Sequence, residues 1–383
     1  MNSGELDAWH YATRKPVRVA WVDGKITAIS AIDKEPKEDI WVAPPLLDLQ
    51  INGYAGVDFQ QDDLTAEQLL QAVRALRRDG CSRLFFTLIT AEWPRLVHRL
   101  RQATQLRQQS PELQAAIVGW HIEGPFLSEQ PGFHGAHNPA WMLDPAAEHI
   151  RELRTITGRD PLLITLAPER RGAIDAIRLA RSLGIVVSLG HTNASVDILR
   201  EAVQAGATGF THLANGCPRE LDRHDNIIWR VADLPGLHHI SLIPDGHHVS
   251  PMLFRLLHRD LLTSRSVYIT TDAMAAAGAP PGRYRLGELE VEVDPDEVVR
   301  QPGKTNFAGS ALRPIDGILR AAQMLKWPWQ SCWSYLSLAP AHFVGVESGF
   351  EVGAPATFCC IKPNDNALEV EWCWNGALSW QQS

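Results

Sequence analysis

The chain has 383 residues, enough for one large barrel-type domain or for two domains of ordinary size. Hydrophobic residues make up 45% of it and charged residues 21%, which is typical of a globular enzyme. A net charge of −8 without a long run of Lys and Arg argues against a nucleic-acid partner. The sequence has no apolar N-terminal leader and no apolar run of membrane-spanning length, so we expect a cytoplasmic protein without a membrane partner.

In chain order, short strand-like pieces come first, and a strand–helix pattern follows. The pattern begins after Pro44-Pro45, where the apolar run LLDLQI precedes a helix with Thr65 as N-cap and Gln68 at the capping-box position. Further apolar runs cover residues 82–90, 115–123, 161–169, 185–192, 208–215, 239–246 and 267–274. Helical patterns follow near residues 93–108, 145–157, 172–183, 195–205, 251–262 and 315–326. The run at 208–215 leads instead into a long loop.

Continuous apolar runs, each followed by a helix, are typical of a parallel sheet that is covered on both faces. About eight such units predict a (β/α)₈ TIM barrel over residues 44–344. A doubly wound open sheet is the competing fold, but no Gly-rich phosphate loop follows the first strand. The segment 280–308 interrupts the pattern and predicts a hairpin insertion. Residues 1–43 and 345–383 are expected to form together a small β-sandwich domain beside the barrel.

Polar residues lie at the ends of the predicted barrel strands, where the active sites of such barrels are found. They are Asp48, Gln50, Asn52, Glu123, His191, His212, Asp245, His247, His248 and Asp272. Among them, Glu123, His191 and His212 supply one carboxylate and two imidazoles. This ligand set suits zinc or another divalent first-row metal. The alternative is that each is a buried polar residue satisfied by ordinary hydrogen bonds.

Asp272 is a candidate general base, because a carboxylate beside a metal-bound water can take its proton and later return it to a leaving group. The alternative is that Asp272 caps the turn after its strand. Arg223, His247 and His248 are the candidates for holding an anion, although an arginine in a polar loop is usually only solvated.

Nine short motifs follow one another along nearly the whole chain. They are LLDLQINGYAGVDF (46–59), HIEGPF (121–126), GAHNP (135–139), LAPE (166–169), GHTNAS (190–195), THLANG (211–216), PDGHHV (244–249), TTDA (270–273) and AGSAL (308–312). In this order they resemble the N-acetylglucosamine-6-phosphate deacetylase family of the amidohydrolase superfamily. The resemblance implies the barrel with its small β domain, a homodimer, and hydrolysis of the acetamide of N-acetylglucosamine 6-phosphate to glucosamine 6-phosphate and acetate.

The resemblance also implies roles for residues of the barrel. Glu123, His191 and His212 match the metal ligands of the family, and Asp272 matches its catalytic acid/base. His137, in GAHNP, matches the histidine that helps to polarise the acetamide carbonyl.

The resemblance further implies a substrate-binding loop and a contact between subunits. Asn215 and Gly216 match positions in the loop that follows the second ligand histidine. Arg223 and His248 match the pair that reaches the sugar phosphate in the neighbouring active site.

A single divalent metal per subunit is expected. Where many amidohydrolases carry His-x-His for a second metal, this chain has Gln50-Ile51-Asn52, and the strand that ends in LAPE offers no bridging lysine. Gln50 and Asn52 are retained as candidate positions for a second metal site. Zinc is the first choice, with iron, manganese and cobalt as alternatives.

Several loops depart from the usual family pattern, and they lie where the sugar and phosphate would bind. They are NGCP at 215–218, DRHDN at 222–226, Arg313-Pro314 and Ala339-Pro340-Ala341. Alternatives to the implied substrate are N-acetylgalactosamine 6-phosphate and a non-phosphorylated acyl amine hydrolysed by another mononuclear amidohydrolase. A barrel that binds a ligand without catalysis is a third alternative. The joint presence of Glu123, His191, His212 and Asp272 argues against it.

Overall fold

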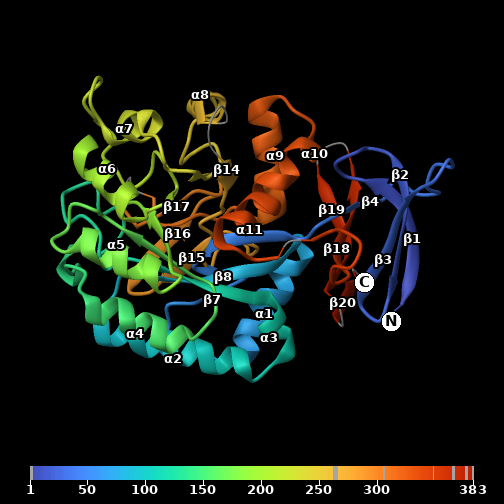
Figure 1. Ribbon diagram of the computed structural model, residues 1–383, viewed down its shortest axis with the longest axis horizontal. Coiled ribbons are helices and arrows are strands. Elements are labelled where there is room, and N and C mark those ends of the chain that lie inside the picture. Colours follow the sequence, from blue (N-terminus) through green and yellow to red (C-terminus); the bar gives the residue numbers. More distant parts are fainter. Residues whose placement is uncertain are drawn as a thin grey trace.

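The computed structural model describes residues 3–261, 266–304, 307–347, 349–364, 367–375 and 378–381. The chain forms a barrel surrounded by helices and a smaller sheet at one side, and both chain ends lie in that smaller sheet (Figure 1).

Eight parallel strands form the barrel in sequence order. They are β5 (Leu46–Ile51), β8 (Cys81–Ile89), β9 (Ile117–Glu123), β10 (Leu162–Leu166), β11 (Val186–Leu189), β12 (Gly209–Phe210), β13 (His239–Leu242) and β14 (Ser266–Ile269). The first strand meets the segment after the last one, because Ile51 pairs in parallel with Ala273 and the Asn52 N–H donates to the Ala273 carbonyl at 2.7 Å. The predicted (β/α)₈ barrel is therefore confirmed.

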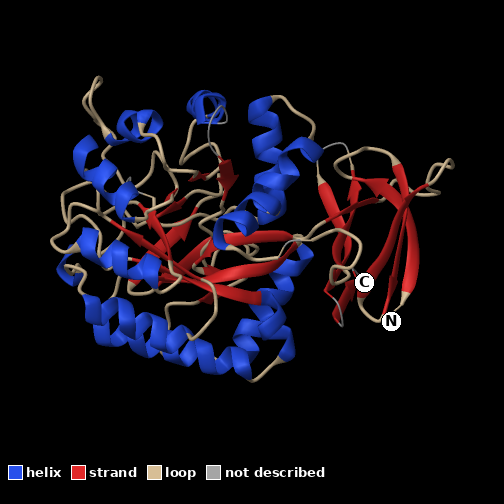
Figure 2. Cartoon of the chain, viewed as in Figure 1, coloured by secondary structure: helices blue, strands red, loops and turns tan. Residues whose placement is uncertain are grey.

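Helices surround the barrel (Figure 2). They are α1 (Ala66–Arg78), α2 (Trp93–Gln108), α3 (Pro111–Ala116), α4 (Ala147–Thr157), α5 (Ala173–Ser182), α6 (Val196–Ala205), α7 (Ile227–Asp233), α8 (Pro251–Leu261), α9 (Pro314–Leu325), α10 (Trp329–Cys332) and α11 (Leu338–Val344), with 3₁₀ turns at Pro139–Trp141 and Trp333–Leu336. Within the described part of the chain, no helix has the length and apolarity that a membrane span requires.

The helix boundaries follow from local chemistry. Thr65 and Gln68 form the predicted capping box of α1, since each accepts a hydrogen bond from the backbone N–H of the other, at 3.2 and 2.9 Å. Helix α7 was not predicted, because the sequence suggested a long loop there. It has only seven residues, and its start is fixed by Asn226, whose side chain accepts from two N–H groups of the first turn.

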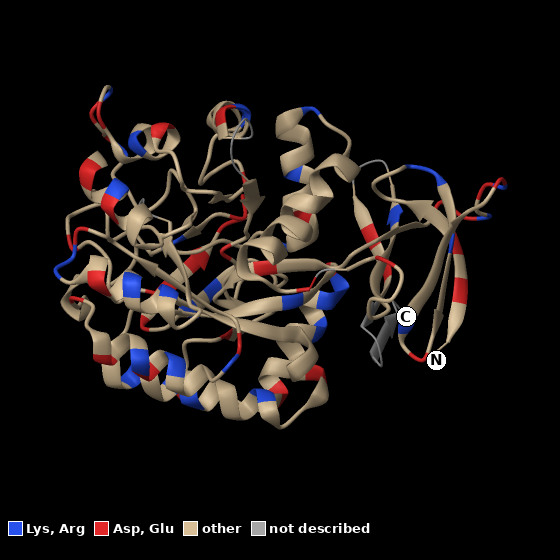
Figure 3. Ribbon diagram, viewed as in Figure 1, with Lys and Arg blue, Asp and Glu red and all other residues tan. Residues whose placement is uncertain are grey.

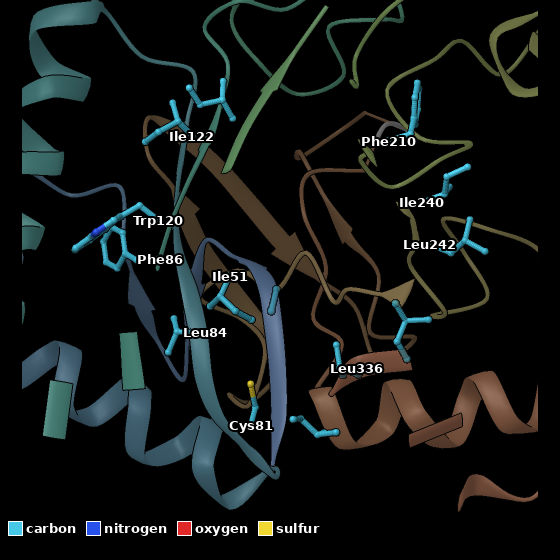
Figure 4. Close-up of a cluster of buried hydrophobic side chains, with 14 of the residues drawn as sticks. Ile51, Cys81, Leu84, Phe86, Trp120, Ile122, Phe210, Ile240, Leu242 and Leu336 are labelled. Atoms are coloured by element: carbon cyan, nitrogen blue, oxygen red, sulfur yellow. The ribbon is translucent and has the colours of Figure 1, made fainter. Parts of the chain in front are cut away.

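Successive side chains along each barrel strand point alternately outward and inward, so the core has an outer layer against the helices and an inner layer inside the barrel. Phe86, Trp120 and Ile122 face the helices and belong to the large outer cluster (Figure 4). Phe85 and Leu163 instead face the barrel interior, where α11 closes the base. On β9, His121 and Glu123 alternate with Trp120 and Ile122. Their side chains therefore point into the barrel, as those of Phe85 and Leu163 do.

The small sheet combines both ends of the chain. Its spatial order is β20 (Leu378–Gln381), β19 (Leu368–Asn375), β18 (Thr357–Pro363), β4 (Trp41–Ala43), β1 (Gly4–His10), β2 (Pro16–Val22) and β3 (Lys25–Ala31). All neighbours are antiparallel except β1 and β4. Val19, Trp21 and Phe358 lie in its separate apolar core. The small β domain agrees with the fold prediction, while its boundaries at 43/44 and 344/345 stay a prediction.

Two further small sheets lie at the barrel. One is the ribbon β6 (Gly53–Tyr54) and β7 (Val57–Asp58), and the other is the predicted insertion β15 (Gly282–Leu286), β16 (Leu289–Val293) and β17 (Val299–Arg300). An ion pair between Arg95 and Glu288 ties the tip of the insertion to α2, and a second one joins Arg95 to Asp62 in the loop before α1. Charged residues of both signs lie along the outer helices α2 and α4 (Figure 3).

Candidate active site

The structure brings the three predicted metal ligands together. Glu123 is the last residue of β9, while His191 and His212 each lie two residues beyond the ends of β11 and β12. Their potential ligand atoms all lie within 4.8 Å of one another, and no member is more than 6% exposed. Glu123 Oε1 lies 2.8 Å from His212 Nε2 and 3.5 Å from His191 Nε2. In the described part of the chain, this is the one such cluster of three acidic, His or Cys residues.

The electrostatics of the cluster favour an ionised carboxylate. Burial alone would raise the pKa of Glu123, but the adjacent imidazole rings of His191 and His212 outweigh it and hold that pKa well below its usual value. An anionic oxygen and two imidazole nitrogens that converge in a buried site are the donor set of a divalent cation such as Zn²⁺. The residues therefore fit a metal.

The ring of His191 is held from three sides. Its Nδ1 lies 2.9 Å from the carbonyl oxygen of Phe133, which fixes Nδ1 as the protonated nitrogen and leaves Nε2 free to ligate. Gly135 and Gly216 cover the ring, and a Cβ on either would lie only 2.8 or 2.6 Å from it. Both glycines also have left-handed backbones, with φ of 59° and 60°. The close approach explains the glycine of the predicted substrate loop.

Three site residues have left-handed backbone conformations that are uncommon outside glycine. The φ angles are 49° at His191, 35° at His212 and 53° at Asp272. Such conformations persist only where the surrounding structure enforces them, and they concentrate at functional sites.

Asp272 follows β14 and lines the same cavity as the ligand cluster. Burial raises its pKa to about 7, and the negative charge of Glu123 adds to the rise. Asn52 Nδ2 donates to Asp272 Oδ1 at 2.7 Å and so fixes the orientation of the carboxyl group. A carboxyl group that titrates near neutral pH is suited to accept and return a proton.

The residues of the first strand support this end of the barrel. Asp48 accepts hydrogen bonds from the hydroxyl groups of Thr270 and Thr271, and also from the Thr271 N–H at 2.9 Å. It thereby fastens the segment that carries Asp272. Gln50, the other second-site candidate beside Asn52, is 2% exposed and does not line the cavity. Sequence reasoning missed the contact between Asn52 and Asp272, because the two residues are 220 positions apart.

His137 lies beside the cluster. Its Nε2 is 3.7 Å from Glu123 Oε2, and its Nδ1 is 2.9 Å from Thr90 Oγ1. Burial lowers the pKa of His137 to about 3, with a further contribution from His191, so the ring is neutral at pH 7. Thr90 Oγ1 also lies 3.4 Å from the Glu123 carbonyl oxygen, so its one proton has two acceptors. The His137 ring proton lies on Nε2 when Thr90 donates to Nδ1, and on Nδ1 when Thr90 donates to Glu123. Thr90 was not found from sequence, and an isolated threonine after a strand carries no signal of this role.

A cavity of about 1020 Å³ opens above these groups. Asn215, Gly216 and His248 line it as predicted substrate-site residues, and Nδ1 of His248 is held by Asp245 Oδ2 at 2.5 Å. Arg223 is exposed and does not line the cavity of its own chain. Four cations on the wall were not predicted. They are Arg95, Arg99, Arg219 and Lys304.

Comparison with known proteins places this site in a family. No family model matches the chain. It is 31% identical to N-acetylglucosamine-6-phosphate deacetylase of Vibrio furnissii, over 91% of this chain and 87% of that one, and 34% identical to the Bos taurus enzyme, over 89% and 83%. It is also 28% identical to N-acetylgalactosamine-6-phosphate deacetylase of Escherichia coli O157:H7, over 92% and 91%.

Solved structures agree with the sequence relatives. An aspartate-to-alanine mutant of N-acetyl-D-glucosamine-6-phosphate deacetylase from Mycobacterium smegmatis, in complex with N-acetyl-D-glucosamine-6-phosphate, superposes with a TM-score of 0.86 at 28% identity over 98% of this chain and 99% of that one. The 5-methylcytosine deaminase of Klebsiella pneumoniae shares the fold, with a TM-score of 0.63 at 12% identity over 99% of this chain and 98% of that one. The identity and coverage of the sequence relatives show that this chain belongs to the N-acetylglucosamine-6-phosphate deacetylase family.

Proposed function

We propose that this chain is a metal-dependent deacetylase that hydrolyses the acetamide of N-acetylglucosamine 6-phosphate to glucosamine 6-phosphate and acetate. The observation that carries the proposal is one cavity lined both by the Glu123–His191–His212 cluster and by Asp272, in a chain of this family. Relatives named for this activity span nearly the whole length of the chain.

The proposal places one divalent metal in each subunit, held by Glu123, His191 and His212. When bound, such a metal acts as a Lewis acid on the substrate carbonyl and makes water a stronger nucleophile near neutral pH. Zinc suits the donor set, and iron, manganese and cobalt are the alternatives. The single cluster in the described residues, with Gln50 and Asn52 in place of two histidines, supports one metal rather than two.

Asp272 is proposed to carry the proton between the two halves of the reaction. It accepts a proton from the attacking water as the water oxygen bonds to the acetamide carbon. It then gives this proton to the nitrogen as the C–N bond breaks, and the acetic acid formed loses its remaining proton to solvent. The contact with Asn52 holds the Asp272 carboxyl group in place for both transfers.

His137 is proposed to stabilise the developing negative charge on the carbonyl oxygen. Its ring is neutral, and with Thr90 donating to Nδ1 the Nε2–H is a hydrogen-bond donor within the cavity. A donor that is held in advance at this point stabilises the transition state more than the ground state.

The sugar phosphate is proposed to bind against Asn215, Gly216 and His248, with Arg223 arriving from the neighbouring subunit of a homodimer. His248 was expected to reach the neighbouring site together with Arg223. Because it lines the cavity of its own chain, we assign it to its own site. Arg223 is exposed and outside that cavity, which supports a role across an interface.

An apolar surface near Arg223 supports the proposed dimer. Trp229 on α7, which follows the Arg223 loop, is 44% exposed, and Met252 and Leu256 on α8 are 66% and 41% exposed. Helices α7 and α8 lie in contact with each other. Large exposed apolar side chains that gather on neighbouring helices are typical of a protein interface.

Acetate release from the phosphorylated and non-phosphorylated sugars tests the activity and its substrate. We expect N-acetylglucosamine 6-phosphate to be cleaved with the higher kcat/KM, and removal of the phosphate to lower kcat/KM by at least about 100-fold. A higher kcat/KM on N-acetylgalactosamine 6-phosphate would instead favour the second candidate, which the 28% identical relative of that name supports. Equal rates with and without the phosphate would contradict the proposed substrate class.

Mixed dimers test the position of Arg223. The Arg223→Gln and Asp272→Asn variants should each be nearly inactive alone. If Arg223 acts across the interface, a mixed dimer of the two contains one intact site, and an equal mixture regains about a quarter of native activity. If Arg223 acts in its own subunit, no site in the mixed dimer is intact and activity stays at the level of the single variants.

A further inference from the structure

A chain of four buried polar side chains runs inside the barrel below the ligand cluster. His121 Nε2 lies 2.8 Å from Thr165 Oγ1, which lies 2.8 Å from Thr211 Oγ1, and Thr211 Oγ1 donates to Ser188 Oγ at 2.7 Å. Each member is at most 2% exposed. The four residues belong to β9, β10 and β11 and to the segment directly after β12, so the hydrogen bonds cross the strands that lead to all three ligands.

The direction of these hydrogen bonds is fixed by the number of protons. Thr211 gives its one hydroxyl proton to Ser188, so the proton between Thr165 and Thr211 must come from Thr165. The proton between His121 and Thr165 must then come from His121 Nε2. Each hydroxyl in the middle of the chain therefore accepts one bond and donates one, and the loss of either leaves two buried neighbours without a partner.

This chain of side chains adjoins each of the three ligands. His121 is two residues before Glu123 and on the same face of β9, and Thr165 is the Cα partner of Glu123 in the neighbouring strand. The Thr165 carbonyl also accepts from the N–H of Gly124 at 3.1 Å.

The two histidine ligands are contacted through the residues before them. Thr211 directly precedes His212. Gly190 directly precedes His191 and lies so close that a Cβ there would be 2.8 Å from Thr165 Cγ2 and 3.2 Å from Thr211 Cβ. Thr165 and Thr211 therefore set the position from which each histidine leaves its strand.

None of the four side chains lines the cavity, so none can touch the substrate. We propose that the hydrogen-bonded chain His121–Thr165–Thr211–Ser188 is a positioning device, which holds Glu123, His191 and His212 at the spacing that binds the metal. The inference rests on the metal centre of the proposed function. It assigns the metal affinity of the enzyme partly to residues that contact neither metal nor substrate.

Thr211→Val tests the inference, because it keeps the branched shape and removes the hydroxyl at the centre of the chain. The probe is Co²⁺, titrated into the metal-free protein and followed by its visible absorption and by competition with a chelator. We expect Thr211→Val to bind Co²⁺ about 10–100-fold more weakly than the native protein, with an altered Co²⁺ spectrum. Thr211→Ser, which restores the hydroxyl, should bind within about threefold of native affinity.

Thr157→Val is the matched control. Thr157 is also a buried threonine, 4% exposed, and its hydroxyl donates to the Leu153 carbonyl at 2.9 Å on α4, outside the barrel. It should lower the melting temperature without changing Co²⁺ affinity or spectrum. If Thr157→Val weakens Co²⁺ binding as much as Thr211→Val does, the effect reflects general loss of stability and the inference is wrong.

Ser188→Ala covers the case in which Thr211→Val does not fold. It removes only the terminal acceptor of the chain and should weaken Co²⁺ binding about 3–10-fold, in the same direction. A folded Thr211→Val or Ser188→Ala protein with native Co²⁺ affinity and spectrum would overturn the inference. A native protein that binds no Co²⁺ would instead refute the metal centre itself, so the two failures are distinguishable.

Discussion

Replacing Asp272 by asparagine is expected to abolish deacetylation and yet to stabilise the metal-free protein at alkaline pH. General acid/base transfer contributes about 10²–10⁴-fold to such reactions, so kcat should fall by about that factor. The gain in stability has a separate cause. The ionised Asp272 carboxylate lies half-buried on the cavity wall, where the negative charge of Glu123 opposes its ionisation, and asparagine keeps its shape, with an oxygen that can still accept from Asn52.

The magnitude follows from the pKa of Asp272. Burial, with the charge of Glu123, raises this pKa from 3.8 to about 7 in the folded state. Between these two values the folded protein holds a proton that the unfolded chain has already released, so the free energy of unfolding falls as the pH rises. The loss of stability caused by ionising Asp272 in the folded protein is absent below about pH 4 and complete above about pH 7. Three pKa units at about 1.4 kcal/mol each set its upper limit at about 4 kcal/mol.

Urea unfolding of the metal-free proteins at pH 5.5 and pH 8.5, with a chelator present, measures this effect. The stability advantage of Asp272→Asn should grow by about 2 kcal/mol between the two pH values, because about 1.5 pH units of that interval lie below the folded pKa. Effects of packing are the same at both pH values and cancel. Asp63→Asn, at an exposed site, controls for the chemical change. An advantage that does not change with pH, or a native protein more stable than the variant at pH 8.5, would refute the reasoning.

Three further changes probe the ligand cluster and its surroundings. Glu123→Gln removes the anionic ligand and should weaken metal binding by more than about 100-fold, which is the largest effect usual for residues that contact a ligand but not the metal itself. Metal content after dialysis measures the loss. His137→Gln should keep the metal but lower kcat by about 10²–10³-fold, with KM little changed, in the acetate-release assay. Gly216→Ala puts a Cβ 2.6 Å from the His191 ring at a φ of 60° and should cost roughly 1–3 kcal/mol of stability, seen as a lower melting temperature, together with weaker metal binding.

The sequence predicted the features that depend on local pattern. Continuous apolar runs followed by helical spacing indicated the barrel, and the polar residues at the run ends included Glu123, His191 and His212, which the structure brings together. This works because the carboxyl ends of parallel strands in a closed barrel all lie at one end. The local pattern is enough to show that a residue lies at the end of a strand. Closure of the barrel then brings the residues at these strand ends close together in space.

The features that depend on pairing between distant segments could not be predicted from local pattern. Asn52 was considered as a second-site position, but its side chain orients Asp272. Asp48 was noted only as a polar strand end, and its role is to fasten Thr270 and Thr271. Each contact depends on the register in which the first strand meets the last one, and neither periodicity nor composition specifies that register.

The backbone at the site shows how the fold maintains a costly geometry. The left-handed conformations of His191, His212 and Asp272 together cost roughly 3–6 kcal/mol, at roughly 1–2 kcal/mol each, which is a substantial part of the 5–15 kcal/mol that typically stabilises a folded domain. All three carbonyl oxygens accept a backbone hydrogen bond. The donors are Ser128 for His191 at 3.0 Å, Asn215 for His212 at 3.0 Å and Ser310 for Asp272 at 2.9 Å.

These three bonds fasten the chain immediately after each strand, at the point where it turns away from the barrel. Two of the donors, Ser128 and Ser310, belong to other loops, so closing the barrel and ordering its upper loops are required before the strained conformations can form. The ligand geometry is therefore a product of tertiary structure rather than of the strands alone. It follows that changes in those loops alter metal binding even where they contact neither metal nor substrate, because they release the backbone that aims the ligands.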